Sequence, residues 1–393
     1  MSQSTERRTL LLVLGFLTFA SVYANVVIIP VLVQIASDFG TTAGTAGLVA
    51  AAYGVPGIVV AILAGPYSDR LGRKLFLVVG AAIMGGATIL SAFAGSFAVL
   101  LATRALAGLG ASVIFPNVNA TIGDTFPYRE RGRAIAAVVA MNTMASVIGL
   151  PVAGIVAEAS SWRVSVGLVG VLALVASFLL VRLLVRDRPE PDDRRARALF
   201  WQVLTNRSAV AALASSLMGA LFWFTWVTFM VLYFQRTYAL TLGTASTVAL
   251  TMGVGVLIGS QVGGRLGDRV GHKQIAAWTM LGGGVLLYVL TNAHLALLAA
   301  AALNLVLSAV VGGRFTANQA LLSEQMPEAR GTMLSLSSSI VSVGMVAGAA
   351  IGGILVDQYG FWALGLFCAS VGVLSAVIVL AFVREARTEL EIA

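Results

Sequence analysis

The ten residues GPYSDRLGRK at positions 65–74 separate two long apolar runs of this sequence. A related stretch, GRLGDRVGHK, stands at positions 264–273, which is 199 residues further along the chain. Glycine, aspartate, arginine, glycine and lysine occur at the same offsets in both copies, and Lys74 and Lys273 are the only lysines present. Self-similarity at a fixed interval indicates internal duplication. The sequence therefore predicts two related halves, each with one charged turn.

The composition is that of a membrane protein. Of the 393 residues 59% are hydrophobic and only 11% are charged, whereas about a quarter of the residues in a soluble domain are charged. The apolar residues occur in blocks of about twenty, the length of a helix that crosses a bilayer. The first block starts near Leu10 and has no small-residue cleavage site, so we expect it to be retained as a spanning helix. The predicted fold class is an all-α membrane protein.

Twelve apolar runs are present, six on each side of a charged linker. We therefore expect twelve transmembrane helices in two six-helix halves, residues 1–184 and 208–393, joined by a cytoplasmic linker at 185–207. Prolines disfavour helix in the linker, but apolar residues at helical spacing near its end favour a short interfacial helix. The alternative is a solvated tether. The expected spans are residues 10–32, 45–65, 75–95, 98–120, 134–157, 164–184, 209–233, 245–264, 275–293, 295–316, 333–355 and 361–383.

The basic residues indicate the topology. Of the 25 Lys and Arg residues, all but four fall in cytoplasmic segments when the N-terminus is placed in the cytoplasm. This bias predicts an inner-membrane protein with both termini in the cytoplasm, and it accounts for the net charge of +8 without a nucleic-acid partner. Arg104 and Arg314 are exceptions that lie within predicted spans. The single cysteine, Cys368, excludes an internal disulfide and gives no reason to expect a metal site.

The charged turn resembles the loop between the second and third helices of the major facilitator superfamily, a glycine followed by Asp-Arg-x-Gly-Arg-Lys. LATRALAGLG at 101–110 resembles the arginine motif of the family's fourth helix. GLPVAG at 149–154 resembles the fifth-helix motif of its antiporters through Gly149, Pro151 and Gly154, with one leucine interposed.

The sequence GRF at 313–315, together with RG at 330–331, resembles bacterial drug and sugar exporters of the twelve-helix group. The resemblance covers essentially the whole chain. It implies two six-helix halves that alternate access to a central site.

Residues of the charged turns, and of the helix end near them, are candidates for gating and coupling. Glycine permits the reversal of the chain, and Asp69 can accept hydrogen bonds at a neighbouring helix start. Arg70 and Arg73 can donate to Asp124 or to lipid phosphate. The resemblance implies a latch between the halves, whereas the alternative is two ordinary positive loops. The candidates are Gly65, Asp69, Arg70, Gly72, Arg73, Asp124, Gly264, Asp268, Arg269 and Gly271.

Polar and aromatic residues within the spans predict an amphipathic substrate cavity. Arg104 lies in an apolar helix, where a charge is costly unless it has a polar partner, faces a cavity or snorkels to the surface. Trp223 and Trp226 are three residues apart and share a helix face. Each residue alone would also suit helix packing. The candidates are Tyr23, Asn25, Arg104, Asn117, Asn119, Asn142, Trp223, Trp226, Arg314 and Asn318.

The acidic residues limit the possible coupling mechanisms. No Asp or Glu lies in the middle of a predicted span, so proton binding by a deeply buried acid is not expected, and Asp124 is the remaining candidate. We expect His272 and His294 to lie in loops, and no phosphate-binding loop motif is present. We therefore expect neither an enzyme nor a bound cofactor or metal.

The expected function is secondary transport that exports small amphipathic drug-like or metabolite compounds, with proton antiport left open. Expected partners are a small-molecule substrate, membrane lipids and, if transport is coupled, protons; we expect a monomer. A sugar or sugar-conjugate exporter is the alternative within this class. A non-transporting receptor or a lipid flippase on the same fold is the alternative outside it.

Overall fold

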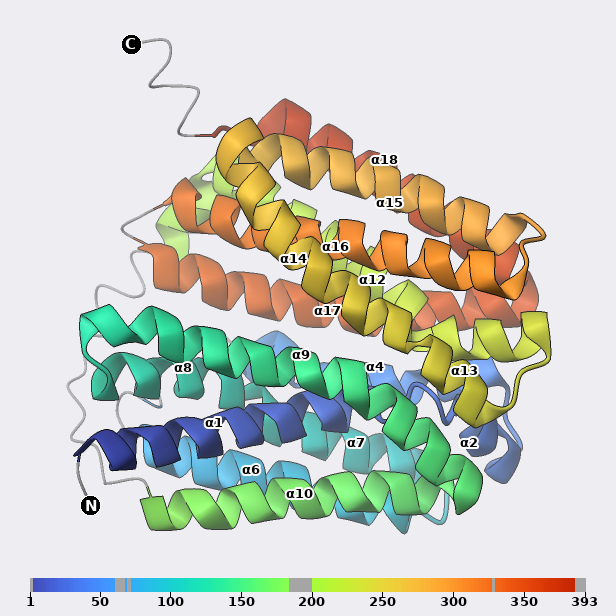
Figure 1. The fold of residues 1–393 in the computed structure, drawn as a ribbon, viewed down its shortest axis with the longest axis horizontal. Coiled ribbons are helices and arrows are strands. Elements are labelled where there is room, and N and C mark those ends of the chain that lie inside the picture. Colours follow the sequence, from blue (N-terminus) through green and yellow to red (C-terminus); the bar gives the residue numbers. More distant parts are fainter. Residues whose placement is uncertain (1–2, 61–67, 69–71, 184–199, 327–328, 386–393) are drawn as a thin grey trace. The chain divides into compact units, whose positions relative to one another are not determined.

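The computed structural model describes residues 3–60, 68, 72–183, 200–326 and 329–385. All regular structure within these residues is helical, which confirms the predicted fold class (Figure 1). The helices are α1 (Gln3–Val26), α2 (Leu32–Asp38), α3 (Ala43–Ala46), α4 (Leu48–Gly54), α6 (Arg73–Ala92), α7 (Phe97–Ser112), α8 (Ile114–Thr125), α9 (Tyr128–Ala159), α10 (Trp162–Leu183), α12 (Arg207–Tyr238), α13 (Leu242–Val248), α14 (Leu250–Val270), α15 (His272–Asn292), α16 (Leu297–Gln325), α17 (Arg330–Gln358) and α18 (Phe361–Phe382).

Twelve segments of the described chain are long and apolar enough to cross a membrane, as predicted. Three of them combine two helices: α3 with α4, α7 with α8, and α13 with α14. The fourth was expected to end at residue 120, but it continues to Thr125 because backbone hydrogen bonding does not stop where the apolar residues stop. This extension places Asp124 on a helix.

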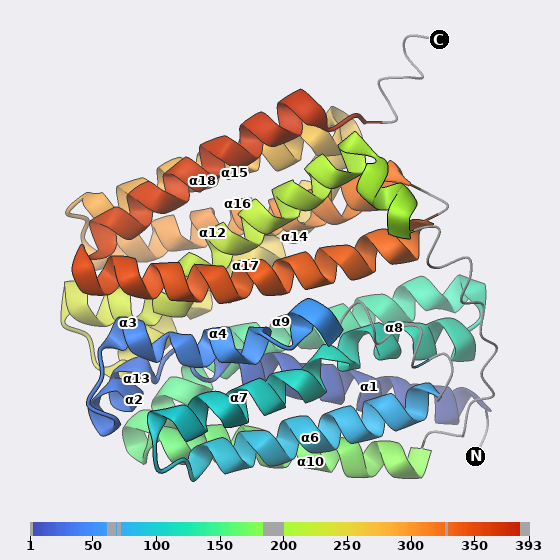
Figure 2. The ribbon, with the colours of Figure 1, turned by 180° about the vertical axis from the view of Figure 1, so that it is seen from behind.

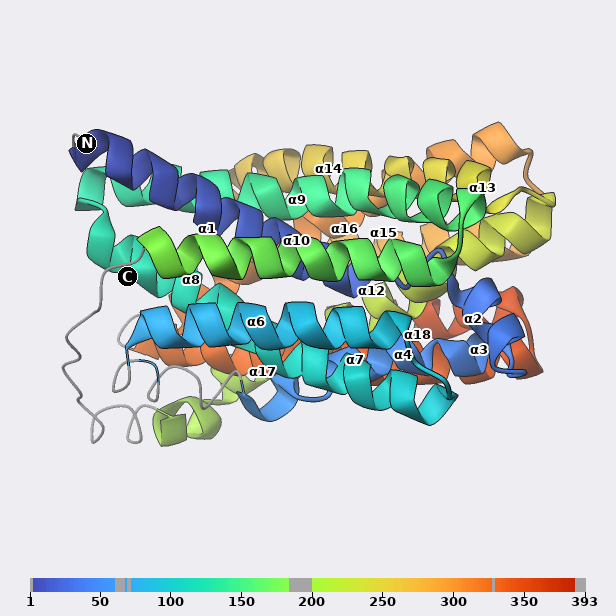
Figure 3. The same cartoon turned by 90° about the horizontal axis from the view of Figure 1, so that it is seen from below.

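The helices form two compact units. In unit 1, α6 packs between α7 and α10, and α1 packs on α9 and α10 (Figures 2 and 3). In unit 2, α14 packs on α16, α15 on α18, and α12 on α17. Two short segments are grouped with the unit of the other half of the sequence: residues 42–47 belong to unit 2 and residues 241–247 belong to unit 1.

Small residues set the closest helix contacts. Gly108 of α7 lies against the backbone of Tyr53 in α4, and a β-carbon there would collide with the Tyr53 carbonyl oxygen. In unit 2, Gly263 of α14 lies against the α-carbon of Gly313 in α16. Membrane helices gain little from apolar burial because lipid is equally apolar, so close backbone approach supplies dispersion contacts instead.

Each charged turn ends on a glycine that starts the next helix. Gly72 has φ 94° before α6, and Gly271 has φ 109° before α15. These values lie in the region that favours glycine, so the predicted reversal is confirmed at both positions. The predicted candidates Gly65, Asp69 and Arg70 lie outside the described residues.

The linker is described only at its end. Residues 200–205 are helical, where the apolar spacing predicted a short helix. Residues 184–199 lie outside the described residues.

Candidate functional site

Arg104 is fully buried in unit 1 between α7, α1 and α4. Its Nη2 donates to the carbonyl oxygen of Ala24 at 2.7 Å, and its guanidinium lies 4.6 Å from the centroid of the Tyr53 ring. The Nε and Nη1 atoms are buried and have no hydrogen-bond partner among the described residues. Arg104 therefore does not snorkel to the surface, and it keeps unused donor capacity inside the unit.

Tyr53 was not predicted as a site residue. Its hydroxyl donates to the carbonyl oxygen of Ser21 at 3.1 Å, which holds the ring beneath Arg104. The attraction between a cation and an aromatic face compensates part of the cost of burying the arginine. A tyrosine within an otherwise apolar run was the only sequence signal for this partnership.

The fifth-helix motif lies beside another predicted cavity residue. Gly149 of α9 leaves space for the Tyr23 ring, since a β-carbon on Gly149 would lie 2.8 Å from the Tyr23 Cδ2. Pro151 lies within α9, and Gly154 lies one turn after Leu150 on the same helix. The motif therefore has a packing role at Gly149, where a large aromatic side chain from α1 meets the helix.

The predicted asparagines of unit 1 lie at different depths. Asn117 is buried and its Nδ2 donates to the Val113 carbonyl oxygen at 2.7 Å, while its Oδ1 has no partner among the described residues. Asn142 is half-buried and its Oδ1 is likewise buried without a partner there. Asn25 and Asn119 are half-buried. Unpaired acceptors within spans are unusual and suit a polar ligand.

Arg314 is the buried cation of unit 2. Its Nη2 donates to the carbonyl oxygen of Ser215 and, at 3.2 Å, to the Ser215 hydroxyl oxygen, but its Nε has no partner among the described residues. Gly219 of α12 makes room for the guanidinium, because a β-carbon there would collide with it. Asn318, one turn after Arg314, donates to the Ser216 hydroxyl oxygen at 2.9 Å.

Ser215, Ser216 and Gly219 were missed from the sequence, although two adjacent serines followed by a glycine within a spanning helix are a recognisable polar signal. They form the α12 side of a polar cluster whose α16 side is Arg314 and Asn318. Among the described residues, the hydrogen bonds of Arg314 go to neutral oxygens, as those of Arg104 do.

The two predicted tryptophans differ in their surroundings. Trp226 is fully buried and its indole N–H donates to the Asn304 Oδ1 at 3.1 Å. Asn304, which was not predicted, also donates to the Thr251 hydroxyl oxygen at 2.8 Å. Trp223 is half-buried. Trp226 therefore belongs to a packed polar network, while Trp223 keeps part of its ring accessible.

The first charged turn holds an ion pair of the expected kind. Arg73 donates to Asp124 and, at 2.7 Å, to the Ala120 carbonyl oxygen. Lys74 donates to the Val181 carbonyl oxygen at 3.1 Å. The structure therefore confirms the predicted ion pair between Arg73 and Asp124.

The second turn has a related arrangement. The Nε2 of His272 lies 3.6 Å from Glu324 and 3.7 Å from Asp268. His272 is the first residue of α15 and not a loop residue as predicted. Its backbone N–H donates a hydrogen bond of 2.6 Å to Glu385, which caps the start of this helix. Arg269 is exposed and Gly264 is half-buried.

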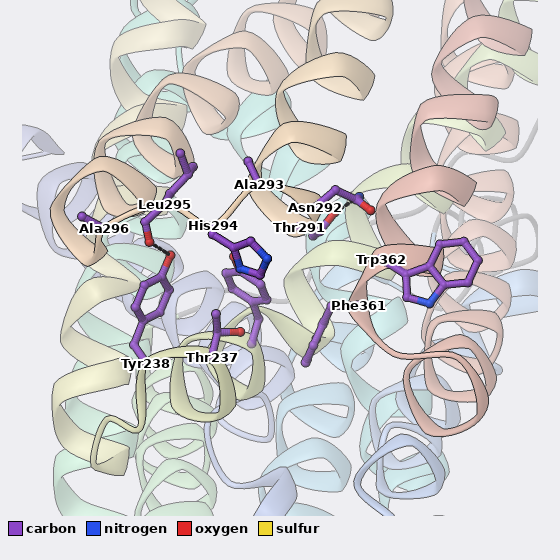
Figure 4. A pocket seen from close by; sticks show the side chains of 11 residues that line it. Thr237, Tyr238, Thr291, Asn292, Ala293, His294, Leu295, Ala296, Phe361 and Trp362 are labelled. Atoms are coloured by element: carbon purple, nitrogen blue, oxygen red, sulfur yellow. Dashed lines mark hydrogen bonds between the residues drawn. The ribbon is translucent and has the colours of Figure 1, made fainter.

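A pocket of about 420 Å³ opens at the ends of α12, α15 and α18 in unit 2 (Figure 4). Tyr238 points its hydroxyl at the Leu295 carbonyl oxygen, and Trp362 points away from the other labelled rings (Figure 4). The hydroxyl groups of both lining tyrosines, Tyr233 and Tyr238, donate hydrogen bonds to backbone carbonyl oxygens. None of the predicted site residues lines this pocket.

The twelve candidate spans of the described residues, the buried arginines and the charged turns repeated in the sequence are typical of a membrane transporter of the two-half type. The chain belongs to the Major Facilitator Superfamily, whose family model matches residues 12–260 and 223–392.

Curated relatives match part of the chain. The quinolone resistance protein NorA of Staphylococcus aureus is 26% identical over 178 residues, 45% of each chain. The probable sulfoacetate transporter SauU of Cupriavidus necator is 30% identical over 195 residues, 49% of this chain and 45% of that protein. The chain thus spans about half the length of the curated relatives it matches.

Solved structures match almost the whole chain. A bacterial homologue of the human lysosomal transporter Spinster, in an inward-facing and unoccupied conformation, gives a TM-score of 0.74 at 16% identity and covers 95% of both chains. The inward-facing and occupied form gives the same TM-score at 18% identity, covering 95% of this chain and 94% of that one. This likeness concerns the fold.

Proposed function

We propose that this major facilitator transporter works by alternating access and exports small amphipathic compounds that carry an anionic or strongly hydrogen-bond-accepting group. The observation that carries the proposal is Arg104. It is fully buried, and two of its guanidinium nitrogens have no hydrogen-bond partner among the described residues. A charged side chain inside the membrane costs several kcal/mol, and such residues mark functional sites. A substrate acceptor group would satisfy those donors.

Arg314 supports the same substrate class independently in unit 2. Its described hydrogen bonds go to neutral serine oxygens, and its Nε is buried without a partner among the described residues. Guanidinium groups bind carboxylate and sulfonate-like oxygens through paired N–H donors. The name of the relative SauU, a probable sulfoacetate transporter, refers to a small organic anion. NorA is named for quinolone resistance, which favours export of drug-like compounds.

The proposed organisation has two six-helix halves, residues 1–184 and 208–393, joined by the linker at 185–207. The basic residues favour a cell-membrane protein with both termini in the cytoplasm. The charged turns then lie at the cytoplasmic ends of the spans, where Arg73 and Asp124 form part of the gate. A monomer contains all the parts this mechanism needs.

The test is transport by purified protein in liposomes, with a panel of matched anionic, neutral and cationic amphipathic compounds, each with and without a pH gradient. We expect movement of the anionic members, and accumulation that depends on the gradient if transport is proton-coupled. Transport of neutral sugars alone would favour the sugar exporter. Movement of a fluorescent phospholipid would favour the flippase, and binding without movement of any compound would favour the receptor.

A further inference from the structure

Two carboxylates accept hydrogen bonds from the first turn of a helix that is distant in the sequence. In unit 2, Asp357 of α17 accepts from the backbone N–H of Gly44 at 3.0 Å and of Thr45 at 3.2 Å. The Thr42 hydroxyl donates to the same carboxylate. These contacts hold α3 against the end of α17 (Figure 2).

The second carboxylate makes the same kind of contact in unit 1. Glu158, near the end of α9, accepts from the backbone N–H of Gly243 and from the Thr241 hydroxyl at 3.4 Å. In both places a threonine also caps its own helix: Thr42 accepts from the Thr45 N–H at 3.1 Å, and Thr241 accepts from the Thr244 N–H at 3.4 Å.

The two contacts are copies of each other. Glu158 and Asp357 are 199 residues apart, and the same interval separates Thr42 from Thr241 and Gly44 from Gly243. It is the interval between the charged turns, which lie at the opposite ends of the spans. Duplication therefore placed one carboxylate and one helix start in each half of the sequence, and each carboxylate contacts the helix start of the other half.

Glycines one turn before each carboxylate allow the close approach. A β-carbon on Gly353 would collide with the carbonyl oxygen of Gly44, and one on Gly154 would collide with the Ser246 hydroxyl. Residues four apart lie on one face of a helix. Gly154 with Glu158, and Gly353 with Asp357, thus form two equivalent strips. The antiporter-like glycine of the fifth helix belongs to one of them.

The contact has a reason to require a carboxylate. The first N–H groups of a helix lack intrahelical partners and carry the positive end of the helix dipole. A carboxylate satisfies them with charge-assisted hydrogen bonds. An amide of the same shape keeps an acceptor oxygen but loses the charge. Each helix start opens one of the candidate spans, Ala43–Val60 or Leu242–Val270.

We propose that Glu158 and Asp357 are a matched pair of gating residues, which must both release these helix starts when the transporter opens toward the outside. The inference rests on the proposed alternating access and topology, which put these ends outside the cell. Residues 42–47 continue into α4 of unit 1, and residues 241–247 continue into α14 of unit 2. Movement of the halves would therefore strain these spans unless the carboxylate contacts break.

Hydrogen exchange of the purified protein in nanodiscs tests the contacts. Asp357→Asn should speed exchange within residues 42–47 roughly 3- to 30-fold, the effect of losing a helix cap, and leave residues 241–247 unchanged. Glu158→Gln should do the reverse. Glu130→Gln is the matched control, because that exposed acid lies at the opposite end of α9 from Glu158. Unchanged exchange in both variants would overturn the proposal.

Labelling tests the gating role without any substrate. In a Cys368→Ser background, Ser246→Cys reports opening, because Ser246 is fully buried against Gly154. Adding Glu158→Gln and Asp357→Asn together should speed labelling by an external membrane-impermeant maleimide at least tenfold, and each alone should do less. If the carboxylate variants speed hydrogen exchange but leave maleimide labelling unchanged, the two carboxylates are only helix caps, and the gating role is overturned.

Folding is checked by size-exclusion chromatography, and Thr42→Val and Thr241→Val serve as milder variants with the same expected direction. Failure of the proposed function would look different. No compound would then move in the liposome assay, while maleimide labelling would still change when Glu158 and Asp357 are substituted.

Discussion

His272 stands in the second charged turn where Arg73 stands in the first, and each contacts the acid at the end of the spanning helix that follows its own. His272 Nε2 lies 3.6 Å from Glu324, and Arg73 forms an ion pair with Asp124. The basic residues are 199 positions apart and the acidic ones 200. Histidine therefore keeps the contact at this position, although it is charged only when protonated, whereas arginine is always charged.

Asp124→Asn tests coupling at the first turn. The amide removes the charge that Arg73 contacts, so we expect downhill transport to persist while accumulation stops depending on a pH gradient. Flux in liposomes with and without the gradient measures this. Glu130→Gln, an exposed acid of the next helix, is the control. If Asp124→Asn still accumulates substrate with the gradient, coupling uses another group.

Arg104→Ala should abolish both net transport and exchange, because it removes the buried donors proposed to bind the substrate. Arg104→Lys should recover little, since an ammonium lacks the planar fork of guanidinium donors. The exposed Arg236→Ala is the matched control and should transport normally. Substrate binding, followed by thermal shift, should be lost together with transport. Normal exchange in Arg104→Ala would reduce Arg104 to a packing role.

Gly108→Ala should destabilise the protein by about 1–3 kcal/mol, the usual cost of overpacking. The new methyl group would meet the backbone of Tyr53, which cannot move aside as a flexible side chain can. Gly86→Ala is the control, because a β-carbon there meets nothing within 4 Å, and the helix should gain up to about 1 kcal/mol. Thermal unfolding in detergent compares the two variants. Equal unfolding temperatures would contradict the close approach of Gly108 to the backbone of Tyr53.

Substitution of the two tryptophans should have different effects, one on stability and the other on substrate contact. Trp226→Leu should lower the unfolding temperature, because it leaves the buried Asn304 Oδ1 without its donor. Trp223→Leu should leave stability nearly unchanged and remove the quenching of tryptophan fluorescence by an apolar substrate. If quenching survives Trp223→Leu, the half-buried ring is only a packing element.

Asp38 predicts a pH dependence outside the spans. The hydrogen bond from the Trp162 indole N–H, at 2.7 Å, and the contact with Arg163 lower the pKa of this carboxyl. A lowered folded-state pKa adds stability above the ordinary pKa of about 3.9, and that stability is lost as the pH falls through the folded value. Asp38→Asn should therefore unfold earlier than wild type at pH 7. Near pH 3 the difference in unfolding temperature between the variant and wild type should become smaller. A difference that does not change with pH would contradict this prediction.

The sequence by itself predicted the twelve spans, and its repeat predicted two related halves. Lengths of apolar blocks are a local property, and a bilayer permits only helices for such blocks because every backbone polar group must be paired internally. The interval of 199 residues was visible in the charged turns alone. Glycine was expected to permit the reversal of the chain in both turns, and Gly72 and Gly271 have positive φ values there.

Only the tertiary structure decided which side chains meet. It paired Arg104 with Tyr53, Arg314 with Ser215, and Glu158 with the helix start at Gly243. In a soluble helix, alternation of polar and apolar residues shows which face is buried. In a membrane helix the lipid-facing and packed faces are both apolar, so the sequence does not fix the rotation of each helix. Close backbone approach at glycines such as Gly108 and Gly353 sets that rotation, and only the folded chain contains it.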